Sequence, residues 1–121
     1  MEMEDSNIQI RRKAADERDE EETVQICLKT YRYGAETLIA VCDCDILGRE
    51  FREGNLHIEV CSDFYGDEKA SLSEVEEALQ GATMANLVGC KVVKHAILLG
   101  WVDEDNVLSI DGVLYAQMVK M

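Results

Sequence analysis

The chain has 121 residues, of which 47% are hydrophobic and none is proline. This length suits one domain of ordinary size, and the apolar fraction excludes a wholly disordered or collagen-like chain. Lys and Arg number 12 against 25 Asp and Glu, so the net charge is −13. Broad binding to DNA or RNA and attachment to an anionic membrane are therefore not expected, because both need a basic surface.

Residues 1–22 differ from the rest of the chain because they hold nine acids and four bases but little apolar surface. Such a segment cannot offset the entropy cost of ordering, so we expect a disordered acidic tail over 1–22 and a single folded domain over 23–121. An interaction arm is the alternative role for the tail. The 99 residues of the domain carry 16 acids and 8 bases, so the domain is acidic as well.

The start of the chain and its cysteines favour a cytoplasmic location. The first residues are acidic and lack the cationic and apolar regions of a signal peptide, and no apolar run approaches the ~20 residues of a membrane span. The five cysteines are an odd number, which fits reduced intracellular thiols better than a disulfide framework.

Apolar runs predict four strands in the first half of the chain. Val24, Ile26 and Leu28 share one face of the first strand, which places Cys27 on the outward face. Gly34 lies in the turn to a second strand, whose nearly continuous apolar run is typical of the centre of a sheet. The predicted strands are 24–31, 37–42 and 55–60, and 49–54 is a short strand or a crossing segment, with a turn at 43–48 and a loop over 61–69.

Capping and turn residues predict the helices and the hairpin in the second half of the chain. Ser71 and Glu74 form a capping box that starts a helix, and Gly81 ends it. Asp111-Gly112 between two alternating runs predicts a two-residue hairpin turn. Residues 82–88 are compatible with strand or helix, and we favour a strand. A second helix is predicted over 90–99, and the last hairpin pairs 106–110 with 113–119.

The predicted order of elements is ββββαβαββ. It indicates an α+β fold with two layers, in which a mostly antiparallel sheet has two short helices packed on one face.

An ordered set of short motifs resembles one archaeal family. The motifs are Val41-Cys42-Asp43, Asp45-Ile46-Leu47-Gly48-Arg49, Arg52-Glu53-Gly54, Phe64-Tyr65-Gly66, Ala85-Asn86-Leu87-Val88-Gly89, and Gly112-Val113 with Ala116-Gln117. Over about residues 24–121 they resemble the uncharacterised conserved proteins grouped as domain of unknown function family 424. The resemblance implies a small two-layer α/β protein of archaeal type in the cytoplasm. It brings no reaction, cofactor or partner.

The thiols and histidines do not form a recognisable metal or catalytic pattern. Cys42-Asp43-Cys44 supplies one C-x-C, whereas structural zinc normally uses two such pairs, so we expect packing thiols, no metal and no cofactor. Cys90 at a predicted helix start is the best candidate nucleophile, but His95 is five residues away and out of register for an i+4 base.

Other chemistry-bearing patterns are weak by themselves. Asp43 and Asp45 could share a face as paired carboxylates, and Gly89 at a helix start could bind an anion through free amides. Cations and aromatics that could suit single-stranded RNA are Lys29, Tyr31, Arg32 and Tyr33, and again Arg49, Phe51 and Arg52.

Polar residues inside apolar runs give the most specific site prediction. Asn86 interrupts a predicted strand, and Gln117 lies two residues beyond Tyr115, so the latter two share a face. If these strands are neighbours, the three side chains converge beside Gly89, either as an internal hydrogen-bonded network or as a binding site. The predicted ligand- or partner-binding residues are Asn86, Gly89, Tyr115, Gln117, Arg49 and Arg52.

The function that the sequence favours is a non-enzymatic binding or accessory module for a protein or RNA partner. By analogy with archaeal housekeeping proteins, a partner from translation is expected. The alternative is a small enzyme or a small-ligand-binding protein with a polar site near Asn86, Gly89 and Gln117. A pocket with convergent polar groups favours the alternative, and an exposed apolar or basic patch favours the binding module.

Overall fold

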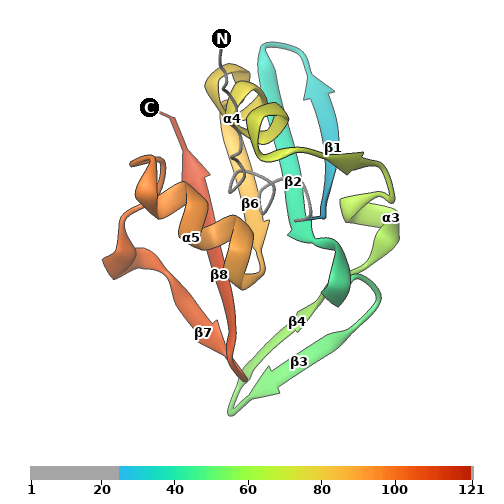
Figure 1. Cartoon of the computed structure of the whole chain (residues 1–121), viewed down its shortest axis with the longest axis vertical. Helices are drawn as coiled ribbons and strands as arrows, with labels where there is room; N and C mark the ends of the chain where they lie inside the picture. Colours follow the sequence, from blue (N-terminus) through green and yellow to red (C-terminus); the bar gives the residue numbers. More distant parts are fainter. Residues whose placement is uncertain (1–24, 121) are drawn as a thin grey trace, which may run out of the picture.

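A computed structural model of the chain describes residues 25–120, so the acidic tail predicted for 1–22 lies outside the described residues (Figure 1). The main sheet contains β1 (Ile26–Tyr33), β2 (Glu36–Asp43), β5 (Lys69–Ala70), β6 (Met84–Val88), β7 (Leu108–Ile110) and β8 (Val113–Val119). A separate hairpin contains β3 (Glu50–Glu53) and β4 (Leu56–Glu59). The helices are α3 (Ser62–Tyr65), α4 (Leu72–Gly81) and α5 (Cys90–Leu98), with short 3-10 turns η1 (Cys44–Ile46) and η2 (Glu104–Asn106).

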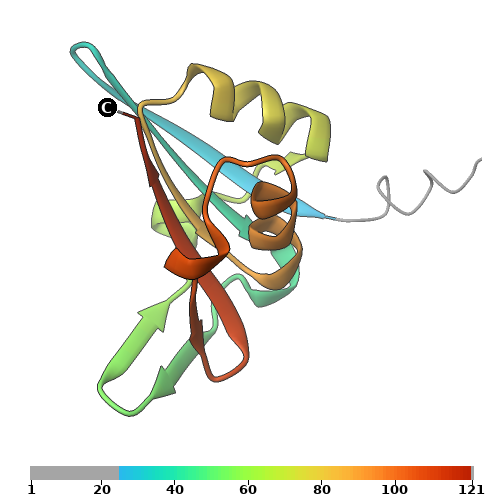
Figure 2. The same ribbon diagram turned by 90° about the vertical axis from the view of Figure 1, so that its left-hand side faces the viewer.

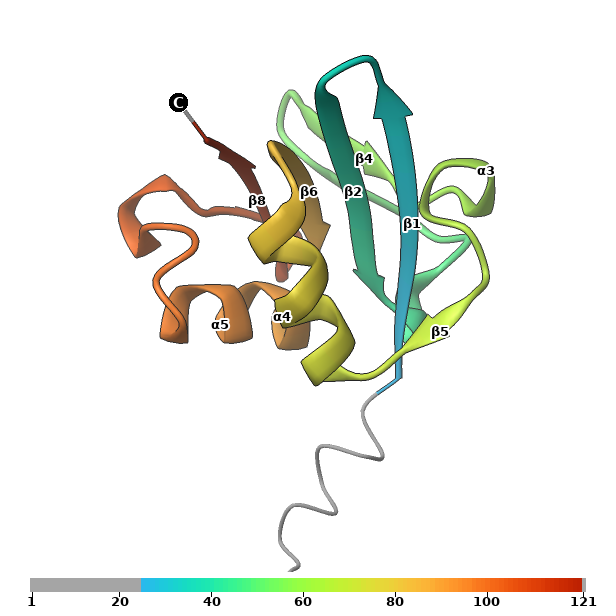
Figure 3. The same ribbon diagram turned by 90° about the horizontal axis from the view of Figure 1, so that it is seen from above.

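The six strands of the main sheet lie in the order β5-β1-β2-β6-β8-β7. Only β2 and β6 run parallel within it, and the other neighbouring strands are antiparallel. The helices α4 and α5 cover one face of this sheet, whereas the β3–β4 hairpin lies on the other side (Figures 2 and 3). The predicted α+β class, with a mostly antiparallel sheet and two helices on one face, is therefore confirmed.

Local signals explain the helical layer. The Ser71 hydroxyl accepts the Glu74 amide at 3.1 Å, and Glu74 Oε1 accepts the Ser71 amide at 2.8 Å, which completes the predicted capping box. Each helix then buries one apolar stripe against the sheet. The buried helical residues are Val75, Leu79, Val92, Val93 and Ala96, and they pack with Ile26, Ile39, Val41, Leu87, Ala116 and Met118 of the strands.

The second face of the sheet has its own apolar core, which the strand pattern did not predict. Cys27 is 2% exposed, so the prediction that it faces outward is wrong. Alternation correctly places Cys27 and Ile26 on opposite faces of the sheet. Whether the Cys27 face is exposed to water depends on which other elements pack on it. The covering segments are the β3–β4 hairpin and α3, and the main buried residues of this second core are Cys27, Cys42, Ile46, Phe51, Val60, Tyr65, Val88 and Ile110.

The secondary structure of two segments could not be predicted from local sequence alone. The prediction of a loop over 61–69 is wrong in part. The segment contains α3, and it leads into the two-residue strand β5, which pairs with β1. The ambiguous segment 82–88 is a strand, as favoured, and β6 lies between β2 and β8. This central position places Asn86 directly opposite Gln117.

Candidate functional site

Three of the predicted site residues meet on β6 and β8. Gln117 Nε2 donates a hydrogen bond to Asn86 Oδ1 at 2.9 Å, and the Tyr115 hydroxyl donates to the same oxygen at 3.2 Å. Two donors on one acceptor fix the orientation of the Asn86 amide. Among the described residues, both of these hydrogen bonds use Asn86 Oδ1, which leaves the N–H groups of Nδ2 to serve as donors.

Asn86 and Tyr115 line a groove with a volume of about 340 Å³ on the face of the sheet away from α4 and α5. We call it the Asn86 groove. Leu56 and Leu108 stand at its rim and are 44% and 46% exposed, which is high for large apolar side chains. Its lining residues are Leu56, His57, Ile58, Phe64, Tyr65, Asn86, Leu108, Ile110 and Tyr115.

The short helix α3 supplies the aromatic wall of the Asn86 groove. Phe64 and Tyr65 pack edge to face with ring centroids 5.0 Å apart, and Tyr31 of β1 stacks on Phe64 at 5.4 Å. The Tyr31 hydroxyl also donates to the Phe64 carbonyl at 2.6 Å, which anchors the helix to the sheet. The sequence pattern predicts a loop here, although two adjacent aromatic residues in a polar segment are a signal that something covers them.

Both tyrosines of the groove stay neutral near physiological pH. Burial raises the pKa of Tyr65, and the nearby Tyr115 and Cys42 raise it further. Burial also raises the pKa of Tyr115 above its usual value, although its hydrogen bond with Gln117 acts in the opposite direction. Apolar walls, phenol hydroxyls and one amide are groups that bind and orient a ligand, and His57 is the one imidazole in the lining.

Gly89 lies apart from the Asn86 groove, at the buried start of α5. There the Asp43 carboxylate accepts the Lys91 amide and the Val92 amide, both at 3.0 Å. The amides that could have bound an external anion are therefore occupied by a residue of the chain itself. Asp43 is 5% exposed and holds these amides, whereas Asp45 is exposed, so the two carboxylates lie in different surroundings.

The two predicted arginines also lie outside the Asn86 groove. The Arg49 guanidinium sits over the Phe51 ring at 5.0 Å, and Arg52 is opposite His57 in the β3–β4 hairpin. His57 in turn lies 3.5 Å from Glu50, so the hairpin mixes both signs of charge. The hairpin thus offers no uniform basic stripe for a phosphate backbone.

The remaining chemical candidates are separated in space. Cys90 Sγ contacts the Gly112 carbonyl at 3.6 Å, whereas His95 Nε2 faces Glu76 at 3.3 Å. Among residues 25–120, no group of three or more His, Cys, Asp or Glu side chains has the arrangement of a metal site. In the same range, no helix has the length and apolar character needed to cross a membrane.

The fold and the groove define a small α+β protein with an aromatic-walled groove beside its sheet. The chain belongs to the family described as protein of unknown function (DUF424), whose model matches residues 31–121. This confirms the resemblance seen in the sequence. A crystal structure of an uncharacterised conserved protein from Methanopyrus kandleri has a similar fold, with a TM-score of 0.65 and 21% identity over 80% of this chain and 94% of that one. No curated protein matches the chain.

Proposed function

We propose that the protein is a non-enzymatic binding module that takes an apolar or aromatic side chain of a partner protein into the Asn86 groove. The observation that carries this proposal is the Asn86 amide, oriented by Tyr115 and Gln117, in the lining of a groove bordered by the exposed Leu56 and Leu108. Large apolar side chains at the rim of an apolar groove are typical of protein interaction sites.

The groove offers a partner segment two kinds of contact. A side chain entering it packs against Phe64, Tyr65 and Ile110, and burial of this apolar surface drives association. The Asn86 amide then donates to a backbone carbonyl of the same segment, which would otherwise lose its hydrogen bond to water. The partner is therefore expected to present an extended segment with one bulky apolar residue.

Charge favours a protein partner over RNA. The described residues carry 16 acids and 8 bases, so a phosphate backbone is repelled while a neutral or basic protein segment is not. RNA remains the other outcome of the experiment below. A partner from translation stays a prediction by analogy, and co-sedimentation with ribosomal subunits tests it.

One observation favours a second candidate, a small ligand. The volume of about 340 Å³ falls within the range of small-molecule sites, and an amide and a phenol converge on it. Of the polar site predicted from the sequence, this alternative keeps Asn86 and Gln117. Gly89 is not part of it, because Gly89 lies against Asp43. A dialysable compound that raises the Tm of the wild type but not of Leu108→Glu would favour this candidate.

The test compares Leu108→Glu with Leu98→Glu by recovery of partners from the native host. Leu108 borders the groove, whereas Leu98 is 80% exposed on α5 at the other face, so the second variant adds the same charge away from the site. We expect Leu108→Glu to lose a partner protein that the wild type and Leu98→Glu retain. Equal recovery in both variants would contradict the proposal, and loss of the recovered material on nuclease digestion would make the partner RNA.

A further inference from the structure

Three of the five cysteines gather where β1 begins and β2 ends, beside η1. Cys27 of β1 is opposite Cys42 of β2, and Cys44 follows two residues later as the first residue of η1. The Cys44 amide donates to the Gln25 carbonyl at 2.9 Å, so the ladder of the two strands extends to this residue. Cys27 Sγ and Cys44 Sγ lie 2.7 Å apart.

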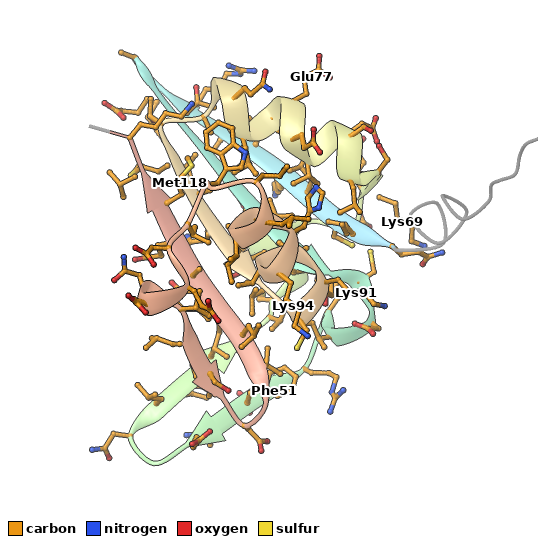
Figure 4. The ribbon with its side chains drawn as sticks, turned by 60° about the vertical axis from the view of Figure 1, so that its left-hand side comes forward. Phe51, Lys69, Glu77, Lys91, Lys94 and Met118 are labelled. Atoms are coloured by element: carbon orange, nitrogen blue, oxygen red, sulfur yellow. The ribbon has the colours of Figure 1, made fainter. Side chains whose placement is uncertain are left out.

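The same two thiols line an open groove with a volume of about 440 Å³, which we call the thiol groove. Cys27 is 2% exposed, whereas Cys44 is half-buried, so an incoming reagent meets Cys44 first. Lys69 and Lys91, both labelled in Figure 4, also line this groove, together with Gln25, Asp45, Leu47 and Asp67. Two lysines and two aspartates line the thiol groove, so its charged side chains balance.

The geometry distinguishes this pair from the other cysteines. A disulfide bond is about 2.05 Å long, so the two sulfur atoms need only a small approach to form one. Cys42 is 0% exposed beneath them and does not line the thiol groove, and Cys90 contacts Gly112 instead. Cys27 and Cys44 are thus a close pair of thiols, of which Cys44 is the accessible member.

We propose that Cys27 and Cys44 are a reversible dithiol–disulfide site that exchanges with a low-molecular-weight disulfide in the thiol groove. The Cys44 thiolate attacks one sulfur of that disulfide, forms a mixed disulfide and releases one small thiolate. The Cys27 thiol then loses its proton to solvent and its sulfur attacks Cys44 Sγ, which breaks the mixed disulfide and releases the second small thiolate. The protein pair is oxidised by two electrons, and the small disulfide is reduced to two thiols.

The surroundings of the pair make this exchange slow near neutral pH. Burial and the neighbouring Cys27 raise the pKa of Cys44 to about 12, with Asp43 acting in the same direction and Lys69 opposing it. The other charged or titratable groups at the site are Cys42, Asp45, Asp67 and Lys91. Because only the thiolate attacks, the initial rate should rise about tenfold per pH unit below that pKa.

The experiment treats the reduced full-length chain with oxidised glutathione and follows intact mass and peptide maps. We expect the loss of two hydrogen atoms and a peptide that joins Cys27 to Cys44, with a Tm raised by about 5 °C or more because the bond ties β1 to η1. Reduced thiols should reverse both changes. The wild-type map identifies the bonded pair without any variant.

Three variants separate the steps. Cys27→Ala should stop at a glutathione adduct on Cys44, Cys44→Ala should give neither adduct nor internal bond, and Cys90→Ala should behave as the wild type. A wild-type bond that involves Cys42, Cys61 or Cys90 would overturn the assignment. Failure of the folded wild type to form an internal bond after prolonged treatment would overturn the proposal itself.

Discussion

Asp43 and Gly89 lie against each other where the central strand β2 meets the start of α5. The Asp43 carboxylate accepts two amides of the first turn of α5, and a Cβ on Gly89 would overlap it. Gly89 also has φ 118°, a conformation that side chains strongly disfavour. A residue of a neighbouring strand thus caps the helix, and the missing side chain at position 89 leaves room for that cap.

Substitution of Gly89 by alanine should be severely destabilising. Gly89→Ala adds backbone strain and displaces the Asp43 cap, so we expect a loss of about 3 kcal/mol or more in the free energy of unfolding. The matched control is Gly81→Ala, because a Cβ added to Gly81 would meet no neighbouring atom within 4 Å and its φ is not positive. The control should change stability by less than about 1 kcal/mol in denaturant unfolding. Equal effects would show that the Asp43 contact does not matter.

The Asp43 carboxyl should titrate above its usual range. Burial raises its pKa, although the Lys91 and Val92 amides oppose this shift. The folded state then binds the proton more tightly than the unfolded state, so the contribution of Asp43 to stability is present below its ordinary pKa of 3.8 and is lost as the pH rises through the folded pKa. The free energy of unfolding of the wild type relative to Asp43→Asn should fall over that window, and the carboxyl carbon signal of Asp43 in NMR should report the same midpoint. A midpoint below 3.8 would reverse the sign and contradict the prediction.

The Asn86 network can be tested for structural and binding roles separately. Asn86→Ala removes the acceptor of Tyr115 and Gln117 and should cost about 1–2 kcal/mol of stability. Gln117 is exposed, so Gln117→Ala should cost less than about 1 kcal/mol. Partner recovery should fall in both variants if the network serves binding, because Gln117 holds the Asn86 amide in place. A large drop in Tm for both variants, with recovery intact at low temperature, would instead assign the network to folding.

The two groove tyrosines predict a loss of stability in alkali. Their folded pKa values are raised from an ordinary value of 10.0, so each contributes stability that is present below pH 10 and is lost as the pH rises through its folded pKa. Tyr65→Phe removes one of these ionisations and should flatten the fall in the free energy of unfolding above pH 10. Tyr33→Phe is the matched control, because Tyr33 is 64% exposed at the end of β1. An unchanged alkaline slope in Tyr65→Phe would count against burial as the cause.

Local chemistry in the sequence determined most of the elements and their order, but not α3 and β5. Ser71 and Glu74 cap α4 because a hydroxyl and a carboxylate three residues apart satisfy free amides, whatever the helix packs on. Asp111 and Gly112 form the last hairpin turn because both adopt positive φ, at 52° and 83°. The period of two in each strand likewise fixed which side chains share a face, including Tyr115 with Gln117.

The tertiary structure determined which elements pack on each face of the sheet. Asn86 faces Gln117 only because β6 pairs with β8, and the groove exists only because α3 and the β3–β4 hairpin fold over the second face of the sheet. Alternation alone placed Cys27 on the outward face. In the structure, α3 and the β3–β4 hairpin bury Cys27 beside Cys44. Sequence patterns over a few consecutive residues predict only the local conformation of those residues. Burial, the capping of α5 by Asp43 and the contact between Cys27 and Cys44 depend instead on residues up to about half a chain apart.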